Sequence, residues 1–201
     1  MKILITKSQY KTILEQEQEV LEIPSVDLFG GWDELQVYLE RRGNPPYSIG
    51  GDLDLSRTPI KSLGNLQSVG GDLDLRETPI KSLGNLYSVV GNLNLVRTSI
   101  KSLGNLQSVG GDLDLYGAPI KSLGNLQSVG GDLDLSRTPI ESLGNLQSVG
   151  GILDLHGAPI KSLGNLSSVG GYFNLTGTPL SKMMTEEQIR NKVNIGGEIF
   201  I

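Results

Sequence analysis

A 20-residue unit repeats along most of this chain without insertion or deletion. The first unit begins at Gly51, and equivalent units begin at Gly71, Gly91, Gly111, Gly131, Gly151 and Gly171. A fixed period of about 20 to 50 residues is the signature of stacked repeat architectures, and it constrains the fold more than any local motif. The repeat therefore predicts a solenoid in which each unit packs only against its two neighbours.

The apolar positions of the first unit predict one short strand and a return path. Leu53 and Leu55 point to one side of this strand, and Asp52 and Asp54 point to the other. The later apolar residues suit an extended or 3₁₀-like return rather than a full helix: Ile60, Leu63, Leu66 and Val69. One unit cannot bury this aliphatic row alone, so we expect the core to form by stacking.

The segment LDLSRTPI (Leu53 to Ile60) resembles the leucine-rich repeat signature LxLxxNxL, with Thr58 where that family usually has Asn. A 20-residue period is similar to the shortest bacterial members. The resemblance covers residues 49–180 and 195–201. It implies a mostly β solenoid, a leucine-rich-repeat-like stack of about eight short parallel strands with helical N- and C-terminal caps. At the position of Thr58, two of the later units carry Ala118 and Ala158, whose side chains cannot form a hydrogen bond. We therefore expect the asparagines equivalent to Asn65 to hydrogen-bond the backbone of the turns instead.

Two other solenoids fit the spacing less well. A pentapeptide-repeat helix needs an apolar residue at every fifth position, whereas Leu53, Thr58, Leu63 and Ser68 alternate between apolar and polar. A calcium-binding nonapeptide roll needs a period of nine, whereas this chain repeats every 20 residues. We therefore favour the leucine-rich arrangement over both alternatives.

The chain divides into a helical N-terminal cap (1–50), the solenoid (51–180) and a C-terminal cap with a final edge strand (181–201). In the first cap, Thr6 with Gln9 reads as a capping box. A helix from about residue 7 would then place a row of side chains on one face: Tyr10, Ile13, Leu14, Glu17 and Leu21. A second helix is predicted from Trp32 to Arg42, with Trp32 covering the open end of the first repeat.

The C-terminal segment predicts a short helix and an eighth strand. Thr185 with Gln188 is a second capping box. The sequence IGGEIFI (Ile195 to Ile201) then repeats the pattern VGGDLDL of the solenoid units. We expect Ile199 and Ile201 inside, and the strand to be an edge open to pairing unless the helix covers it.

Composition limits the partners and the compartment. The net charge of −5 does not favour direct nucleic-acid binding, and the chain has no cysteine for disulfides or thiolate chemistry. Apolar runs fall short of the about 20 residues that span a membrane. Charged residues interrupt the first 20 positions, so we expect no signal peptide and a cytoplasmic location.

The outward strand residues form acidic columns on the expected concave face. The nine aspartates of this face are Asp52, Asp54, Asp72, Asp74, Asp112, Asp114, Asp132, Asp134 and Asp154. Like charges about 4.8 Å apart repel by roughly 1 kcal/mol per pair. Three interpretations follow: solvated carboxylates partly neutralised by Arg57, Arg97 and Arg137; a docking surface for a basic partner; or a calcium site, with candidates Asp112, Asp114, Asp132 and Asp134.

The later repeats add larger side chains to this acidic face, which is typical of interface anchors: Tyr116, Ile152, His156 and Tyr172. Tyr172 could instead pack with Phe200 under the C-terminal cap. Ser136, His156 and Asp154 form a nominal Ser-His-Asp set, but a flat solenoid face supplies no oxyanion hole, so we assign no catalytic residue and no cofactor. We expect a non-enzymatic protein.

We expect a protein-protein interaction scaffold that binds a partner with a basic surface on its acidic concave face. The residues expected to contact the partner are Asp54, Asp74, Asp114, Asp134, Asp154, Tyr116, Ile152, His156 and Tyr172. A structural protein of a bacterium or phage that forms homo-oligomers through its C-terminal edge strand is the first alternative. An acidic decoy that mimics nucleic acid is the second. We expect no membrane contact.

Overall fold

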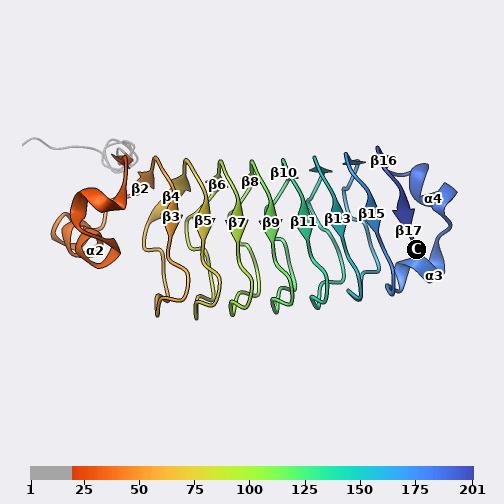
Figure 1. The fold of residues 1–201 in the computed structure, drawn as a ribbon, viewed down its shortest axis with the longest axis horizontal. Helices are drawn as coiled ribbons and strands as arrows, with labels where there is room; N and C mark the ends of the chain where they lie inside the picture. The colour runs from red at the N-terminus through yellow and green to blue at the C-terminus, as the bar shows by residue number, and fades with distance from the viewer. Residues whose placement is uncertain (1–19) are drawn as a thin grey trace, which may run out of the picture.

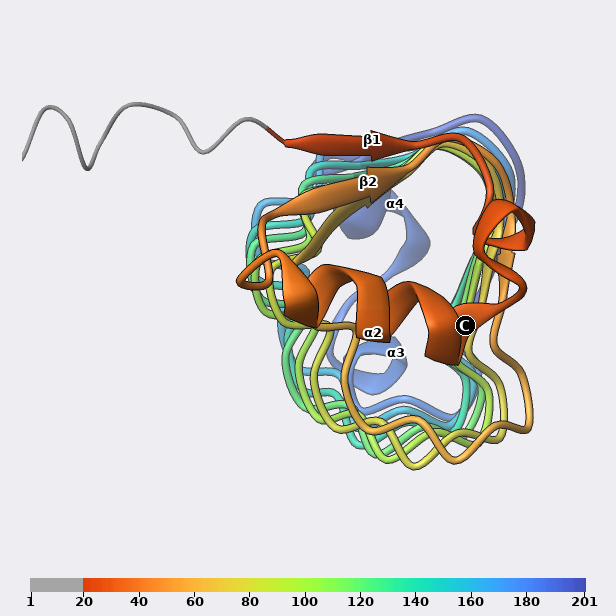
Figure 2. The same ribbon diagram turned by 90° about the vertical axis from the view of Figure 1, so that its left-hand side faces the viewer.

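The computed structural model describes residues 20–201, which form a parallel β-solenoid. Figure 1 shows its turns stacked along a nearly straight axis, and Figure 2 shows the same stack end on. Each turn contributes one strand to each of two parallel sheets. Because the axis is nearly straight, the strand face that we expected to be concave is close to flat along its length.

Sheet B contains the predicted LxL strands and has eight members, as the repeat pattern indicated. All neighbouring pairs are parallel and in register, so Leu133 lies beside both Leu113 and Leu153. The strands, in sequence order, are β3 (Leu53–Asp54), β5 (Leu73–Asp74), β7 (Leu93–Asn94), β9 (Leu113–Asp114), β11 (Leu133–Asp134), β13 (Leu153–Asp154), β15 (Phe173–Asn174) and β17 (Ile199–Phe200).

Sheet A was not predicted as a sheet, because we interpreted its residues as part of the return path. It has nine parallel strands, and in most of them the valine equivalent to Val69 is buried in the core. The strands are β1 (Leu21–Ile23), β2 (Tyr47–Ile49), β4 (Leu66–Val69), β6 (Ser88–Val89), β8 (Ser108–Val109), β10 (Ser128–Val129), β12 (Ser148–Val149), β14 (Ser168–Val169) and β16 (Asn194–Ile195).

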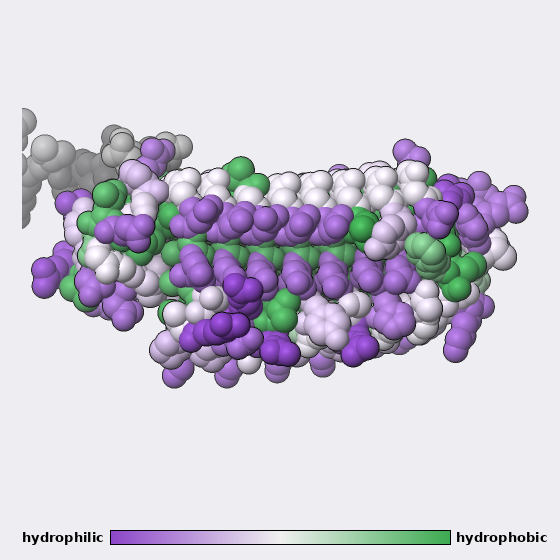
Figure 3. Space-filling model, viewed as in Figure 1, coloured by the Kyte–Doolittle hydropathy of each residue, from purple (hydrophilic) through white to green (hydrophobic). Residues whose placement is uncertain are grey.

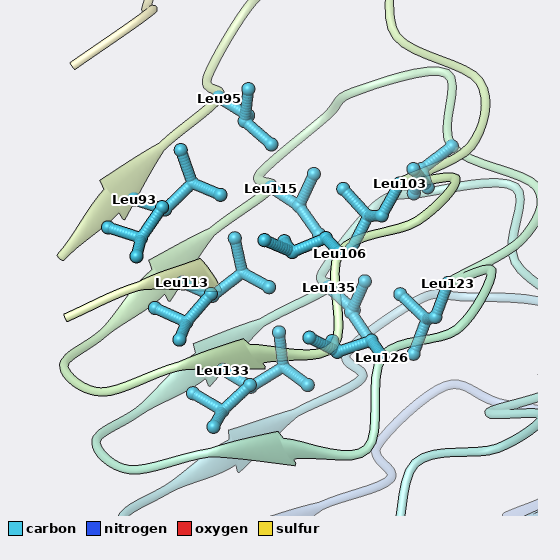
Figure 4. Close-up of a cluster of buried hydrophobic side chains, with 14 of the residues drawn as sticks. Leu93, Leu95, Leu103, Leu106, Leu113, Leu115, Leu123, Leu126, Leu133 and Leu135 are labelled. Carbon is cyan, nitrogen blue, oxygen red and sulfur yellow. The ribbon is translucent and has the colours of Figure 1, made fainter. Parts of the chain in front are cut away.

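The core is a set of stacked aliphatic columns between the two sheets. Figure 4 shows Leu113 and Leu115 of one turn facing Leu123 and Leu126, with equivalent leucines above and below. Leu115 and Leu126 have no exposed surface. Burying one such side chain contributes about 1.5–3 kcal/mol. The period of the sequence therefore matches the period of the core.

The two sheets meet at a Gly-Gly corner where successive turns approach very closely. In most turns the second glycine of the pair lies beside the aspartate side chain of the preceding turn, and Gly111 lies beside Asn92 in the same way. A Cβ at Gly131 would overlap Asp112 Oδ1 and would lie 2.9 Å from the carbonyl carbon of Gly111. The position tolerates only glycine because the backbones themselves are in contact there.

A second tight turn follows each sheet B strand. The residue three positions after the aspartate has a left-handed backbone, with φ of 57° at Arg137 and 63° at Gly117. The next residue closes the turn: the Thr138 Oγ1 hydroxyl donates to Leu135 O at 2.7 Å, whereas Ala118 is buried without such a bond. Side chains of the Asn column reach backbone carbonyls, as at Asn145 to Gly124 O (3.2 Å), as expected.

The N-terminal cap continues sheet A and then covers the open end. A 3₁₀ helix (Val26–Phe29) leads into helix α2 (Trp32–Arg41), which lies across the first turns in Figure 2. The α2 range agrees with the prediction. Leu35 and Leu39 are its buried residues, whereas Trp32 is only partly buried against the core.

Two expectations for the N-terminal cap need separate treatment. Leu21 was expected on a helix face, but it belongs to strand β1 and pairs with Tyr47. Leu21 and Ile23 point to the same side of this strand, and Ile23 is buried. Strand β1 therefore extends sheet A by one member. The rest of that expected helix, including the Thr6–Gln9 capping box, lies outside the described residues.

The C-terminal cap consists of helices α3 (Leu180–Met183) and α4 (Glu186–Arg190) and the strands β16 and β17. The Thr185–Gln188 capping box is present as predicted. Arg190 donates to Ile195 O at 3.2 Å and to Gly197 O at 3.0 Å, which ties α4 to the last turn. Strand β17 pairs with β15, which confirms the eighth strand.

The expectation that Ile201 lies inside is wrong. Its side chain is 51% exposed, whereas Ile199 is partly buried against the core. Leu175, at the equivalent unit position, is completely buried because a further turn stacks on it. No described turn follows Ile201, so one side of its position stays uncovered.

We predict that Gly131→Ala will destabilise the solenoid by about 1–3 kcal/mol, because the new methyl group must displace backbone or the Asp112 side chain. The matched control is Gly51→Ala, at the same unit position in the first turn. Its Cβ would meet only Pro24 O, at 3.3 Å, so a smaller loss of about 0.5 kcal/mol is expected. Urea unfolding followed by circular dichroism measures both; equal losses would contradict the close-approach argument.

Candidate interaction surface

The first column of the acidic face is a hydrogen-bonded ladder between turns. Each side chain accepts the backbone N–H of the equivalent residue in the next turn, as when Asp132 N–H donates to Asp112 Oδ1 at 2.8 Å. The ladder runs without a break from Asp52 to Ile152, whose N–H donates to Asp132 at 2.7 Å. We call this set the Asp52 column: Asp52, Asp72, Asn92, Asp112 and Asp132.

The second column closes the turn that follows each sheet B strand. Each side chain accepts the N–H of the residue two positions later, which is an Asx turn. Asp114 accepts from Tyr116 at 2.9 Å, and Asp134 accepts from both the N–H and the hydroxyl of Ser136. We call this set the Asp54 column: Asp54, Asp74, Asn94, Asp114, Asp134, Asp154 and Asn174.

The arginines expected to neutralise these columns point elsewhere. Arg57 and Arg97 both pair with Glu77, at 3.5 and 3.3 Å, and the Arg137 guanidinium lies 5.7 Å from the centre of the Tyr116 ring. Arg76 is the one arginine that pairs with a column member among the described residues, at 2.9 Å from Asp74 Oδ2. Among the described residues, Arg57, Arg97 and Arg137 therefore form no direct ion pair with the columns, although the positive charge of Arg57 helps to lower the pKa of Asp54.

The N-terminal end and the middle of the Asp54 column differ in the acidity of their carboxyl groups. Partial burial raises the pKa of Asp114 above its usual range, and the neighbouring carboxylate of Asp134 adds to this. Hydrogen bonds from Ser56, through its hydroxyl and its N–H, lower the pKa of Asp54. The middle of the face therefore holds its negative charge at a greater electrostatic cost than the N-terminal end does.

Figure 3 shows the acidic face as two hydrophilic rows along the rod, with a hydrophobic strip between them. The larger side chains that were predicted as interface anchors lie on opposite sides of the Asp54 column. Tyr116 and His156 are exposed on the turn after the strand, whereas Ile152 and Tyr172 precede the strand. The structure therefore does not bring Tyr116 and Tyr172 into one patch.

Tyr172 instead contacts Phe200 of the last turn. The two rings meet edge to face at 5.5 Å between centroids, and their side chains are 40% and 42% exposed. This pair covers the end of the acidic face without being enclosed by the C-terminal cap. It supplies an exposed aromatic surface next to strand β17.

The nominal Ser-His-Asp set is not assembled for proton transfer. Ser136 is buried and its hydroxyl donates to Asp134 Oδ1 at 2.6 Å. His156 is exposed, and its backbone N–H, rather than its ring, donates to Asp154. These contacts close turns, which is the role that the same positions have in other units.

The four calcium candidates divide between the two columns. Asp112 and Asp132 use Oδ1 for the ladder, and Asp114 and Asp134 use it for their turns. Within residues 20–201, no group of three or more His, Asp or Glu side chains is arranged to hold a metal ion. Each carboxylate therefore has one oxygen committed to the backbone.

Sequence reasoning missed an open groove of about 600 Å³ on the outer side of sheet A. Its lining repeats with the solenoid and consists mainly of serine, valine and glycine residues from successive turns, among them Ser108, Val109 and Gly110. Val90 at its edge is 64% exposed and replaces a glycine of the other units. The serine column was visible in the sequence but offered no charged or aromatic signal.

Comparison with known proteins gives no assignment: no family model, no curated protein and no solved structure matches this chain. Within residues 20–201, none of the helices has the length and apolar character needed to cross a membrane. The surface must therefore be interpreted from its own geometry.

We predict that Asp134→Ala will destabilise the protein by about 1–2 kcal/mol, because the buried Ser136 loses the acceptor for its N–H and hydroxyl. Asp134→Asn should preserve most of this stability, since Asn94 and Asn174 accept the same bond in their own turns. Urea unfolding compares the two variants, and equal losses would contradict an acceptor-only role.

We predict opposite pH dependences for Asp114→Asn and Asp54→Asn. The pKa of Asp114 is raised, so its ionised form disfavours folding at neutral pH, and the wild type gains stability as pH falls through that folded pKa. The Asn variant should therefore be relatively more stable at pH 7 than at pH 4. The pKa of Asp54 is lowered, so its contribution is present at neutral pH and is lost as pH falls. Thermal unfolding across this range tests both signs, and parallel profiles would refute them.

Proposed function

We propose that this chain is a non-enzymatic protein-interaction scaffold that docks a basic protein surface on the acidic face of sheet B. The proposal rests on one observation: the Asp54 column carries more negative charge than its turns require. The Asp54 turn requires only an acceptor oxygen, which Asn94 and Asn174 also provide. Five of its seven positions nevertheless carry a carboxylate, and these are Asp54, Asp74, Asp114, Asp134 and Asp154.

The carboxylates of the two columns are also held in place before any partner arrives. Each Oδ1 is fixed by a backbone N–H, and within residues 20–201 only Asp72 and Asp74 have a hydrogen-bond or ion-pair partner for Oδ2. Binding would therefore cost little side-chain entropy. Complementary charge would mainly accelerate association and fix the register of the partner.

The finer identity proposed for the repeat is that of a short leucine-rich repeat protein. Its support is the LxL strand followed by a turn, with buried Leu63 and Leu66 on the return path. Scaffolding by such solenoids is a fold-level analogy. The proposed docking face rests on its fixed carboxylates rather than on that analogy.

We predict that the wild type will capture a basic partner that a four-site variant does not capture. The variant carries Asn at Asp74, Asp114, Asp134 and Asp154, which preserves the turn acceptors. The bait is incubated with lysate of the native host, and captured proteins are eluted with increasing salt, which screens charge contacts. The captured protein should be basic, and its purified form should bind the wild type directly in a salt-sensitive manner.

The control changes four exposed carboxylates away from the acidic face to their amides: Glu22, Asp33, Glu40 and Glu187. It removes the same number of charges as the four-site variant, so its capture should match that of the wild type. Capture that is equal for all three baits, or that is lost equally by both variants, would refute docking on the acidic face.

A second candidate function is assembly through strand β17. The N–H groups of Phe173 and Leu175 donate to Glu198 O and Phe200 O, so the alternate residues Ile199 and Ile201 direct their backbone groups to the other edge. Within the described residues no strand pairs with that edge. Deletion of residues 197–201 should then abolish a concentration-dependent oligomer without unfolding the solenoid.

A further inference from the structure

A row of exposed lysines runs parallel to the aspartate columns. It occupies one position in the loops that follow strands β3 to β13 of sheet B. These loops lie toward the lower edge of the rod in Figure 1. Successive loops are bonded to each other, as when Lys121 N–H donates to Lys101 O at 2.9 Å. We call this set the lysine row: Lys61, Lys81, Lys101, Lys121 and Lys161, with Glu141 at the equivalent position of the fifth unit.

Most ammonium groups of this row are not used by the fold. Lys161 pairs with Glu141 at 2.8 Å. Lys61, Lys81, Lys101 and Lys121 form no ion pair within residues 20–201, and all four are exposed. Stacking of the turns therefore does not explain why lysine recurs at this position.

The charges of the solenoid are thus separated onto two neighbouring sides. The acidic face carries nine aspartates. The side formed by the loops after the sheet B strands carries two rows of charged residues, and together these rows hold eight basic and two acidic side chains. They are Arg57, Glu77, Arg97, Arg137, the five lysines of the lysine row and Glu141. Residues 51–180 are nearly balanced in total, with 11 acidic and nine basic side chains. A low net charge therefore conceals two strongly charged stripes of opposite sign.

We propose that the lysine row of one copy docks on the acidic face of a second copy of this chain, with the two rods parallel. The inference rests on the proposed function, because it names the basic partner of the same acidic face. Both stripes have the rise of the solenoid, about 4.8 Å per turn. Charges in two copies therefore remain in register along the whole contact, whereas a partner of a different period would lose register after a few turns.

The available area is sufficient for such a contact. The lysine row spans six turns, and six turns at about 4.8 Å, each about 20 Å across with its flanking turns, give a face of roughly 600 Å². Two such faces bury roughly 1,200 Å² in total, which is at the lower end of the range of specific protein interfaces, about 1,200–2,000 Å². Each matched pair of opposite charges replaces the repulsion that a column of like charges experiences alone.

The contact is heterologous, because the acidic face and the lysine row are different surfaces. A copy that uses its lysine row keeps its acidic face free for another copy. Parallel rods could then form a closed ring or a longer bundle, depending on the rotation between neighbours. Association should depend on both protein concentration and salt.

The test is sedimentation velocity of the full chain at about 20 mM and about 500 mM salt, where the Debye length is about 20 Å and about 4 Å. We expect the wild type to associate at low salt and to dissociate at high salt. The double variant Lys81→Gln/Lys101→Gln should weaken association at least about tenfold. The matched control Lys182→Gln/Lys192→Gln, in the C-terminal cap, should behave as the wild type does.

A complementation experiment tests which surfaces meet. The variant Asp114→Asn/Asp134→Asn preserves the turns and should also fail to associate. Mixing it with Lys81→Gln/Lys101→Gln leaves one intact acidic face and one intact lysine row, so the mixture should form one-to-one dimers that grow no further. Association by either variant alone, or no dimer in the mixture, would overturn the proposal.

Three outcomes separate this inference from the proposed function. Binding of an oligolysine peptide is measured in parallel for the wild type and for Asp114→Asn/Asp134→Asn. A wild type that stays monomeric at low salt but binds oligolysine through these aspartates overturns the inference and leaves the docking function standing. A wild type that does neither overturns both. Association that persists at high salt and in the lysine variant overturns the inference in favour of the β17 edge.

Discussion

The close approach of successive backbones at the Gly-Gly corner is the constraint on which the rest of the structure depends. At Gly131 the preceding turn leaves no space for a Cβ, and the Asp112 side chain takes the N–H of Asp132 in the same place. This contact sets the rise between turns and aligns the strands of both sheets. It also aligns every exposed column, so that a residue type that recurs at one position of the unit forms a stripe along the rod.

The same constraint divides the surface residues into those that the fold explains and those that it does not. The fold explains an acceptor oxygen in the Asp54 column, because the turn N–H would otherwise lose its partner. It does not explain a negative charge there, since Asn94 closes its turn equally well. Nor does it explain the positive charge at Lys81 or Lys101. The charges are therefore the features that a binding function can account for.

Much of the fold followed from the period, but the interactions of single groups did not. The LxL strands, the α2 range, the Thr185 capping box and strand β17 were predicted because each has a pattern of several residues. Sheet A was missed because most of its strands are two residues long and only one, such as Val109, is buried. The prediction for Ile201 was wrong because the repeat pattern gives the direction of a side chain but not whether a neighbouring turn covers it. In the site, the aspartate columns were predicted, whereas the pairing of Arg57 and Arg97 with Glu77 depends on side-chain reach.

Variation among the units provides an internal comparison for these roles. The second corner glycine is present in all seven units, where the backbone contact demands it, whereas the position two residues after the Asp54 column changes in nearly every unit. That position has no common side-chain role, and it carries Ser56, Arg76, Val96, Tyr116, Ser136, His156 and Thr176. Lysine recurs in five of the seven units at an exposed position where stacking requires no ammonium group, and the other two units carry Glu141 and Ser181. A residue that recurs without a structural requirement needs a contact outside the turn itself, and an acidic stripe with the same rise offers one.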